Sequence, residues 1–110
     1  EKLDFTYIED LAKGCVLAGT KEKGINQIFN ITFGRAQTLY SFVMNLKKLF
    51  PDLKYKIKTR DKSKPSRGTL SINKAQKFLN FNPKYSLKIG VNKYVKYLID
   101  NNIYKKIEKK

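Results

Sequence analysis

The chain has 110 residues, of which 41% are hydrophobic, so it can form one small domain with a modest core. Its formal net charge is +15, and it contains one cysteine and no histidine. This composition excludes an intramolecular disulfide, a Cys/His metal site and the usual histidine general base. No apolar run is long enough to cross a membrane, and we expect a cytoplasmic protein without membrane contact.

The first predicted helix begins near Thr6 and ends near Gly19. Thr6 and Glu9 have the spacing of a capping box, in which each side chain satisfies the backbone N–H of the other residue. Because Cys15 lies on the apolar face of this helix, we expect it to be a buried small hydrophobe rather than a nucleophile. The residues at helical spacing on this face are Ile8, Leu11, Ala12, Cys15, Val16 and Ala18.

A short buried strand is predicted at 27–31, followed by a loop in which Gly34 can adopt a positive φ. Thr38 is a good N-cap for the next helix, and Pro51 ends that helix. The apolar face of this helix consists of Leu39, Phe42, Val43, Leu46, Leu49 and Phe50.

Residues 53–58 alternate between apolar and charged side chains, which predicts a half-exposed edge strand. A loop follows at 59–69. Ser71 is expected to cap a short helix that carries Ala75, Phe78 and Leu79, and Ser86 to cap the last helix. The last helix has its apolar face at Leu87, Val91, Tyr94, Val95, Leu98 and Ile99.

These elements predict a small α/β unit in the order α-β-α-β-α-α, with a frayed basic tail at 104–110. Two strands alone are marginally stable. Either something outside these residues completes the sheet, or the helices carry the core.

Five segments, taken in order, resemble the C-terminal, substrate-binding part of extended short-chain dehydrogenases/reductases, the NAD-dependent sugar-nucleotide epimerases and dehydratases. Asp4–Ala12 (DFTYIEDLA) is similar to the family's D-F-x-Y-V-x-D-x-A, and Phe29–Gly34 (FNITFG) to F/Y-N-[IL]-G-x-G. Ser71–Ala75 (SINKA) and Phe78–Pro83 (FLNFNP) are similar to D-[IA]-S-K-A and L-G-[WFY]-x-P. Ser86–Val91 (SLKIGV) is similar to S-L-x-E-G-[IL].

The resemblance implies that residues 1–103 are the nucleotide-sugar-binding subdomain of an isomerase or lyase of this family. The family's Gly-rich turn for NAD and its catalytic Tyr-x-x-x-Lys are both absent from the 110 residues. We therefore expect a fragment cut just upstream of Asp4, with no catalytic residue and no activity of its own. NAD is expected only in the full-length protein, bound by a Rossmann domain that lies outside this stretch.

The expected substrate is a nucleoside-diphosphate sugar, whose phosphates favour guanidinium groups. The chain has only three arginines, Arg60, Arg67 and Arg35, and all three are candidates for phosphate contact. Arg60 matches a family arginine only after a shift of one residue, because the ungapped match is Asp61. The basic residue that usually precedes D-F-x-Y is replaced by Leu3. The family pattern assigns an architectural role to Asp4, Phe5, Thr6, Tyr7 and Asp10.

Two alternatives stay open. The charge could serve a free-standing nucleic-acid-binding module built on 54–67 and the lysine tail, although lysine-rich composition also follows from A/T-rich codons. We favour the nucleotide-sugar reading over nucleic acid. A protein-interaction domain is the other alternative, since an exposed docking face for the Rossmann domain could lead to homodimers.

Overall fold

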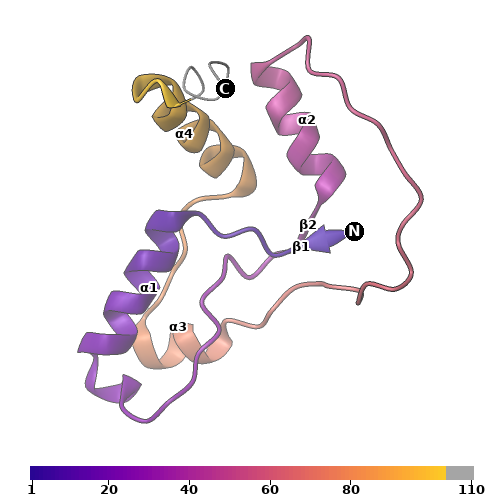
Figure 1. Ribbon diagram of the computed structural model, residues 1–110. Helices are drawn as coiled ribbons and strands as arrows, with labels where there is room; N and C mark the ends of the chain where they lie inside the picture. Colours follow the sequence, from indigo (N-terminus) through magenta and orange to yellow (C-terminus); the bar gives the residue numbers. More distant parts are fainter. Residues whose placement is uncertain (104–110) are drawn as a thin grey trace.

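A computed structural model describes residues 1–103 of the chain. Within them, two short strands and one 3₁₀ turn accompany four α-helices (Figure 1). The elements in chain order are β1 (Lys2–Leu3), α1 (Ile8–Thr20), the 3₁₀ turn η1 (Glu22–Gly24), β2 (Gln37–Thr38), α2 (Leu39–Leu49), α3 (Asn73–Leu79) and α4 (Leu87–Asp100).

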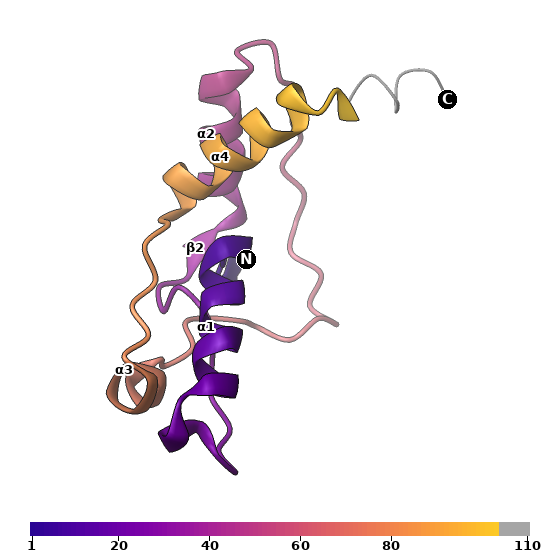
Figure 2. The same cartoon turned by 90° about the vertical axis from the view of Figure 1, so that its left-hand side faces the viewer.

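The helices form two pairs, at opposite ends of the molecule. Helix α2 packs on α4 at one end, and α1 packs on α3 and η1 at the other (Figures 1 and 2). Between them, β1 and β2 form an antiparallel ladder in which Lys2 faces Thr38 and Leu3 faces Gln37. The loop from α2 to α3 runs along one side, away from the helices (Figure 1).

The main core lies between α1 and α3. Ala75, Leu79 and Phe81 are fully buried there, and Asn80 connects them in the left-handed conformation, with φ of 53°. A smaller apolar contact joins the segment between β1 and α1 to helix α2, where the rings of Phe5 and Phe42 stack with their centroids 5.2 Å apart. Partly buried residues around the main core are Leu17, Ala18, Phe29, Ile31 and Phe78.

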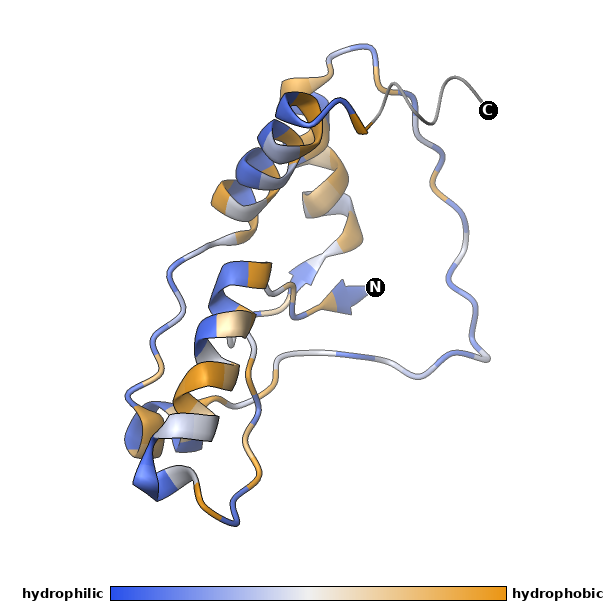
Figure 3. Cartoon of the chain, turned by 60° about the vertical axis from the view of Figure 1, so that its left-hand side comes forward, coloured by the Kyte–Doolittle hydropathy of each residue, from blue (hydrophilic) through white to orange (hydrophobic). Residues whose placement is uncertain are grey.

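The fold is open for its size. Its radius of gyration is 16.8 Å, whereas a compact domain of this length has about 13 Å. Its accessible surface is 8842 Å², against about 6,300 Å² for a compact monomer of the same mass. Many apolar residues therefore stay in contact with solvent. Figure 3 shows where apolar and polar residues lie along the chain.

Several local predictions are confirmed. Thr38 and Ser86 cap α2 and α4, because their hydroxyls accept hydrogen bonds from the backbone N–H groups of Ser41 (3.0 Å) and Ile89 (3.4 Å). Gly34 has the expected positive φ, at 79°. Ser71 is a partial exception: its hydroxyl accepts from Asn73 at 3.4 Å, but the N-cap of α3 is Ile72.

Both predicted strands are wrong for the described chain. Residues 27–31 and 53–58 contain no strand, and the only ladder pairs 2–3 with 37–38. A strand needs a hydrogen-bonded neighbour, and neither segment has one within residues 1–103. The predicted order α-β-α-β-α-α is therefore replaced by the observed order, although the mixed fold with a two-stranded sheet and four helices is present.

The predicted first helix is also corrected. It begins at Ile8, its N-cap is Tyr7 without a side-chain hydrogen bond, and Thr6 and Glu9 form no capping box. Its buried face contains Asp10 and Gly14. The predicted apolar face, including Cys15, is largely exposed. The physical reason is that α3 and residues 29–31 pack on the opposite face.

The apolar faces predicted for α2 and α4 are only partly covered. Val91 and Val95 are buried, whereas Leu39, Phe50, Tyr94 and Ile99 are exposed at their edges. The tail predicted to fray, 104–110, lies outside the described residues. Among the helices of residues 1–103, none combines the length and apolar character needed to span a bilayer.

Candidate functional site

A basic cavity lies between the N-terminal segment and the loop 59–69. Its volume is about 390 Å³, and it is lined by four cationic side chains and one carboxylate. The structure thus brings together two of the three candidate arginines, which lie seven positions apart in the sequence. The lining residues are Glu1, Lys2, Leu3, Arg60, Lys64, Pro65, Ser66 and Arg67.

Arg60 is held by its own loop. Its Nη2 donates a hydrogen bond of 2.8 Å to the carbonyl oxygen of Lys64, which closes a turn across 60–64. Its Nε lies 4.0 Å from the carboxylate of Glu1, a half-exposed ion pair. Most of the guanidinium donors are therefore free to bind an anion in the cavity.

Arg67 is positioned through the end of the same loop. The backbone N–H of Leu70 donates to Asp4 at 3.1 Å, and the hydroxyl of Thr69 accepts from the backbone N–H of Ala36 at 2.9 Å. These two contacts fix the loop beside β1. Arg67 also lines a neighbouring hollow, which it shares with Leu3 and Asp4.

Asp4 is the hub of these contacts. Besides Leu70, its carboxylate accepts hydrogen bonds from the hydroxyl of Thr32 (3.0 Å) and from the backbone N–H groups of Gly34 (3.1 Å) and Arg35 (3.3 Å). One carboxylate thereby joins the start of the chain to two loops that lie 28 to 66 residues away. Since four donors share two oxygens, the carboxylate's bonding capacity is filled.

The remaining sequence candidates lie elsewhere. Arg35 is exposed and does not line the basic cavity. Asp61, the ungapped match to the family arginine, accepts hydrogen bonds from the backbone and hydroxyl of Ser63 at 3.0 and 2.6 Å. These bonds hold its pKa below the ordinary value. Asp61 therefore stays negatively charged near neutral pH, which suits it poorly to phosphate contact.

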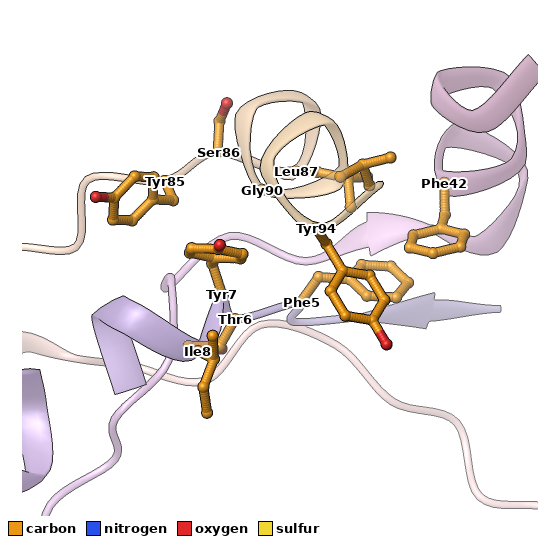
Figure 4. Close-up of a pocket in the computed structure, with 11 residues that line it drawn as sticks. Phe5, Thr6, Tyr7, Ile8, Phe42, Tyr85, Ser86, Leu87, Gly90 and Tyr94 are labelled. Atoms are coloured by element: carbon orange, nitrogen blue, oxygen red, sulfur yellow. The ribbon is translucent and has the colours of Figure 1, made fainter. Parts of the chain in front are cut away.

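A second cavity, of about 280 Å³, lies between the start of α1 and α4 (Figure 4). Its walls are almost entirely apolar and contain five aromatic rings, so it suits an apolar or aromatic group rather than an anion. The rings come from Phe5, Tyr7, Phe42, Tyr85 and Tyr94.

Two tyrosines of this aromatic pocket have a raised pKa. The hydroxyl of Tyr85 donates a 2.5 Å hydrogen bond to the Glu9 carboxylate, which favours the protonated phenol and raises its pKa. Burial, together with the charge of Glu9, raises the pKa of Tyr7. A tyrosine that acts as a general base needs a lowered pKa, so neither residue is suited to that role at neutral pH.

We predict that Glu9→Ala lowers the pKa of Tyr85 towards its ordinary value of 10.0. NMR titration of ring-labelled tyrosine measures this value directly. Because the folded-state pKa is raised, the contact stabilises the fold below about pH 10 and loses this effect as the pH rises through the raised pKa. Glu22→Ala, an exposed change in η1, is the control; an unchanged Tyr85 titration in Glu9→Ala would contradict the prediction.

Asp10 forms the second carboxylate hub. It is only 4% exposed and accepts hydrogen bonds of 2.9 Å from the backbone N–H groups of both Lys84 and Tyr85. This contact ties the first turn of α1 to the segment that leads into α4. It thereby sets the position of Tyr85 in the aromatic pocket.

The described residues offer no obvious place for a metal or a dinucleotide. No group of three or more His, Cys, Asp or Glu side chains is placed to hold a metal ion within 1–103. The sequence also lacks a Gly-rich strand–helix turn, the usual cradle for a cofactor pyrophosphate. The chemistry that the basic cavity does offer is anion binding.

Sequence reasoning missed part of both cavities. Lys2 and Lys64 also line the basic cavity. They could not be singled out beforehand, because the chain has 21 lysines and nothing in the sequence distinguishes these two from the others. The aromatic pocket was not predicted either. Its rings lie in three separate segments, and only the fold brings them together.

The chain was compared with known proteins. No protein-family model matches it, and no curated protein sequence matches it. Solved structures do match. An epimerase, Mth375, from Methanothermobacter thermautotrophicus superposes with a TM-score of 0.84 at 23% identity, over 99% of this chain and 32% of that one.

Two further structures give the same result. UDP-glucuronic acid 4-epimerase from Bacillus cereus, in complex with UDP-glucuronic acid and NAD, has a TM-score of 0.76 and 27% identity, over 89% of this chain and 33% of its own. The Bordetella bronchiseptica enzyme WbmF, in complex with NADH, has a TM-score of 0.78 and 19% identity, over 94% and 31%. The chain therefore spans about a third of these proteins, and its resemblance to sugar-nucleotide epimerases is confirmed in the structure.

Proposed function

We propose that this chain is the C-terminal, substrate-binding part of an NAD-dependent nucleotide-sugar epimerase or dehydratase. The observation that carries the proposal is the structural match of most of the chain to about a third of the length of two epimerases, at TM-scores of 0.84 and 0.76. The five sequence segments that resemble the family support it independently. No observation on the described residues favours the nucleic-acid alternative over this one.

In this proposal the basic cavity binds the diphosphate of the substrate. Arg60 and Arg67 supply planar guanidinium donors, and Lys2 and Lys64 supply point charges. The position before Asp4, basic in the family but Leu3 here, is thus compensated by cations from the loop 59–69. NAD and the catalytic groups belong to the other part of the protein, because the described residues offer no pyrophosphate cradle.

We predict that the 110-residue chain binds UDP weakly, with a dissociation constant of about 1 mM. The double variant Arg60→Ala/Arg67→Ala should weaken this binding at least tenfold, about 1.4 kcal/mol, because it removes both guanidinium groups from the cavity. Chemical-shift titration with UDP and with inorganic phosphate measures the two affinities.

Arg35→Ala is the matched control, since it removes an exposed arginine outside the basic cavity. The proposal requires that this variant binds UDP like the parent chain. Equal losses in Arg35→Ala and in the double variant would show a diffuse charge effect instead of a site. Tight binding of NAD by the 110 residues alone, or the absence of nucleotide-sugar conversion by the intact protein, would overturn the proposed function.

A further inference from the structure

The loop 59–69 carries four hydroxyl side chains, and one of them lies on the basic cavity. The hydroxyls of Ser63 and Thr69 take part in hydrogen bonds of 2.6 and 2.9 Å, and Thr59 lines a neighbouring cavity. Ser66 lines the basic cavity itself and is exposed. Its hydroxyl is therefore the one in this loop that is both accessible and next to the candidate anion site.

The surroundings of Ser66 are strongly cationic. Four cationic side chains and one carboxylate line the same cavity, which leaves an excess of three positive charges. The carboxylate belongs to Glu1, which is half-exposed and lies 4.0 Å from the Nε of Arg60. A phosphate group on the Ser66 hydroxyl would share the cavity with two guanidinium and two ammonium groups, the donors that bind phosphate most strongly.

The other side of Ser66 repels an anion. Ser66 and Arg67 also line the hollow that contains Asp4. The Asp4 carboxylate already accepts hydrogen bonds from four donors, so it offers a phosphate only like-charge repulsion. The electrostatic balance therefore directs a phosphate on Ser66 away from Asp4 and into the basic cavity.

The loop around Ser66 is accessible to a modifying enzyme. Residues 59–69 contain no helix or strand, and the loop from α2 to α3 runs along one side, away from the helices (Figure 1). Basic residues lie on both sides of the serine, so the loop complements an enzyme with an acidic substrate cleft. These residues are Lys56, Lys58, Arg60, Lys62, Lys64 and Arg67.

We propose that Ser66 is the target of a protein kinase and that its phosphate closes the basic cavity to substrate. In the modification, Ser66 Oγ bonds to the γ-phosphorus of ATP, the bond from that phosphorus to the bridging oxygen breaks, and ADP leaves. The hydroxyl proton passes to a base of the kinase. The inference rests on the proposed function, in which this cavity binds the substrate diphosphate. A phosphoserine carries a charge of about −1.5 to −2 and would occupy the same cations.

Chains with phosphoserine incorporated at position 66 or at position 63 test this competition. Phosphate at 66 should weaken UDP binding at least tenfold in a chemical-shift titration, because it occupies the cavity. Position 63 is the matched control: it lies in the same loop and adds the same charge, but Ser63 does not line the cavity. Its phosphate should weaken binding less than threefold. An unchanged affinity with phosphate at 66, or equal losses at both positions, would overturn the inference.

The titration of the phosphate gives a readout that does not depend on UDP. Followed by phosphorus NMR, the second pKa of the phosphate should be lower at position 66 than at position 63, because nearby cations favour the doubly charged form. Arg60→Ala/Arg67→Ala should raise the pKa of the phosphate at 66 again, since it removes both guanidinium groups from the cavity. The same phosphate pKa at both positions would overturn the inference.

Mass spectrometry of the intact protein, purified from its own cells, tests whether the modification occurs. The peptide that covers 59–69 should be partly phosphorylated, with the phosphate on Ser66; its absence from Ser66 would overturn the inference.

These readouts separate the switch from the proposed function. A chain that binds UDP equally with and without phosphate at 66 would retain the function and refute the switch. An unmodified chain that fails to bind UDP, although the phosphate at 66 titrates with a lowered pKa, would refute the role of the cavity in the proposed function and retain the modification site.

Discussion

Asp4→Ala should cost the 110-residue chain about 3 to 4 kcal/mol of unfolding free energy, measured by urea denaturation. The variant removes a carboxylate that accepts four hydrogen bonds, three of them from backbone N–H groups. Hydrogen bonds to charged groups contribute about 1.5 to 3 kcal/mol each when buried, and partial exposure reduces the sum here. Small domains have total stabilities of only about 5 to 15 kcal/mol, so the loss is a large fraction.

The same variant should weaken UDP binding, because the bond from Leu70 to Asp4 holds the end of the loop that carries Arg67. Asp52→Ala is the control: Asp52 is exposed and forms no hydrogen bond or ion pair within residues 1–103, so its loss should change stability by less than about 0.5 kcal/mol. A stability of Asp4→Ala equal to that of Asp52→Ala would contradict the hub role of Asp4.

Asp10→Ala should cost about 2 to 3 kcal/mol, because it leaves the partly buried backbone N–H groups of Lys84 and Tyr85 without this acceptor. The loss should be accompanied by faster hydrogen exchange at these two amides and by a changed environment of Tyr85 in the aromatic pocket. Asp10→Asn should recover little, since its amide offers one acceptor oxygen and faces the other N–H with a donor.

Asp100→Ala gives the comparison with an exposed carboxylate. Asp100 pairs with Lys96 at 3.2 Å on the surface of α4, and such pairs contribute about 0 to 1 kcal/mol. The difference between the two variants measures what burial and backbone partners add. If Asp10→Ala and Asp100→Ala were equally stable, the contact of Asp10 with the segment before α4 would be unimportant for the fold.

Part of the candidate site was predictable from the sequence. The scarcity of arginine singled out Arg60, Arg67 and Arg35, and the structure places the first two, but not Arg35, on the basic cavity. The family pattern singled out Asp4 and Asp10, but their partners could not be read from it. Their hydrogen bonds reach 28 to 75 residues along the chain, so no local pattern contains them.

For the two predicted strands, the local composition was informative but the pairing could not be predicted. The residues at 27–31 have the apolar, β-prone composition of a strand, and in the structure Phe29 and Ile31 pack on the core whereas Ile28 and Asn30 are exposed. Only the ladder is missing, because no neighbouring strand is present among the described residues. The segment 53–58 likewise forms no ladder with another strand among the described residues, and Ile57 is 75% exposed there.

What the sequence by itself determined is the set of helices and most of their ends, including Thr38 and Ser86 as caps and Pro51 after α2. These features depend on hydrogen bonds and backbone preferences within a few residues. Tertiary structure alone decided which face of α1 is buried, which residues form strands and which cations share a cavity. Each of these depends on what packs alongside, and the packing partners are distant in the chain.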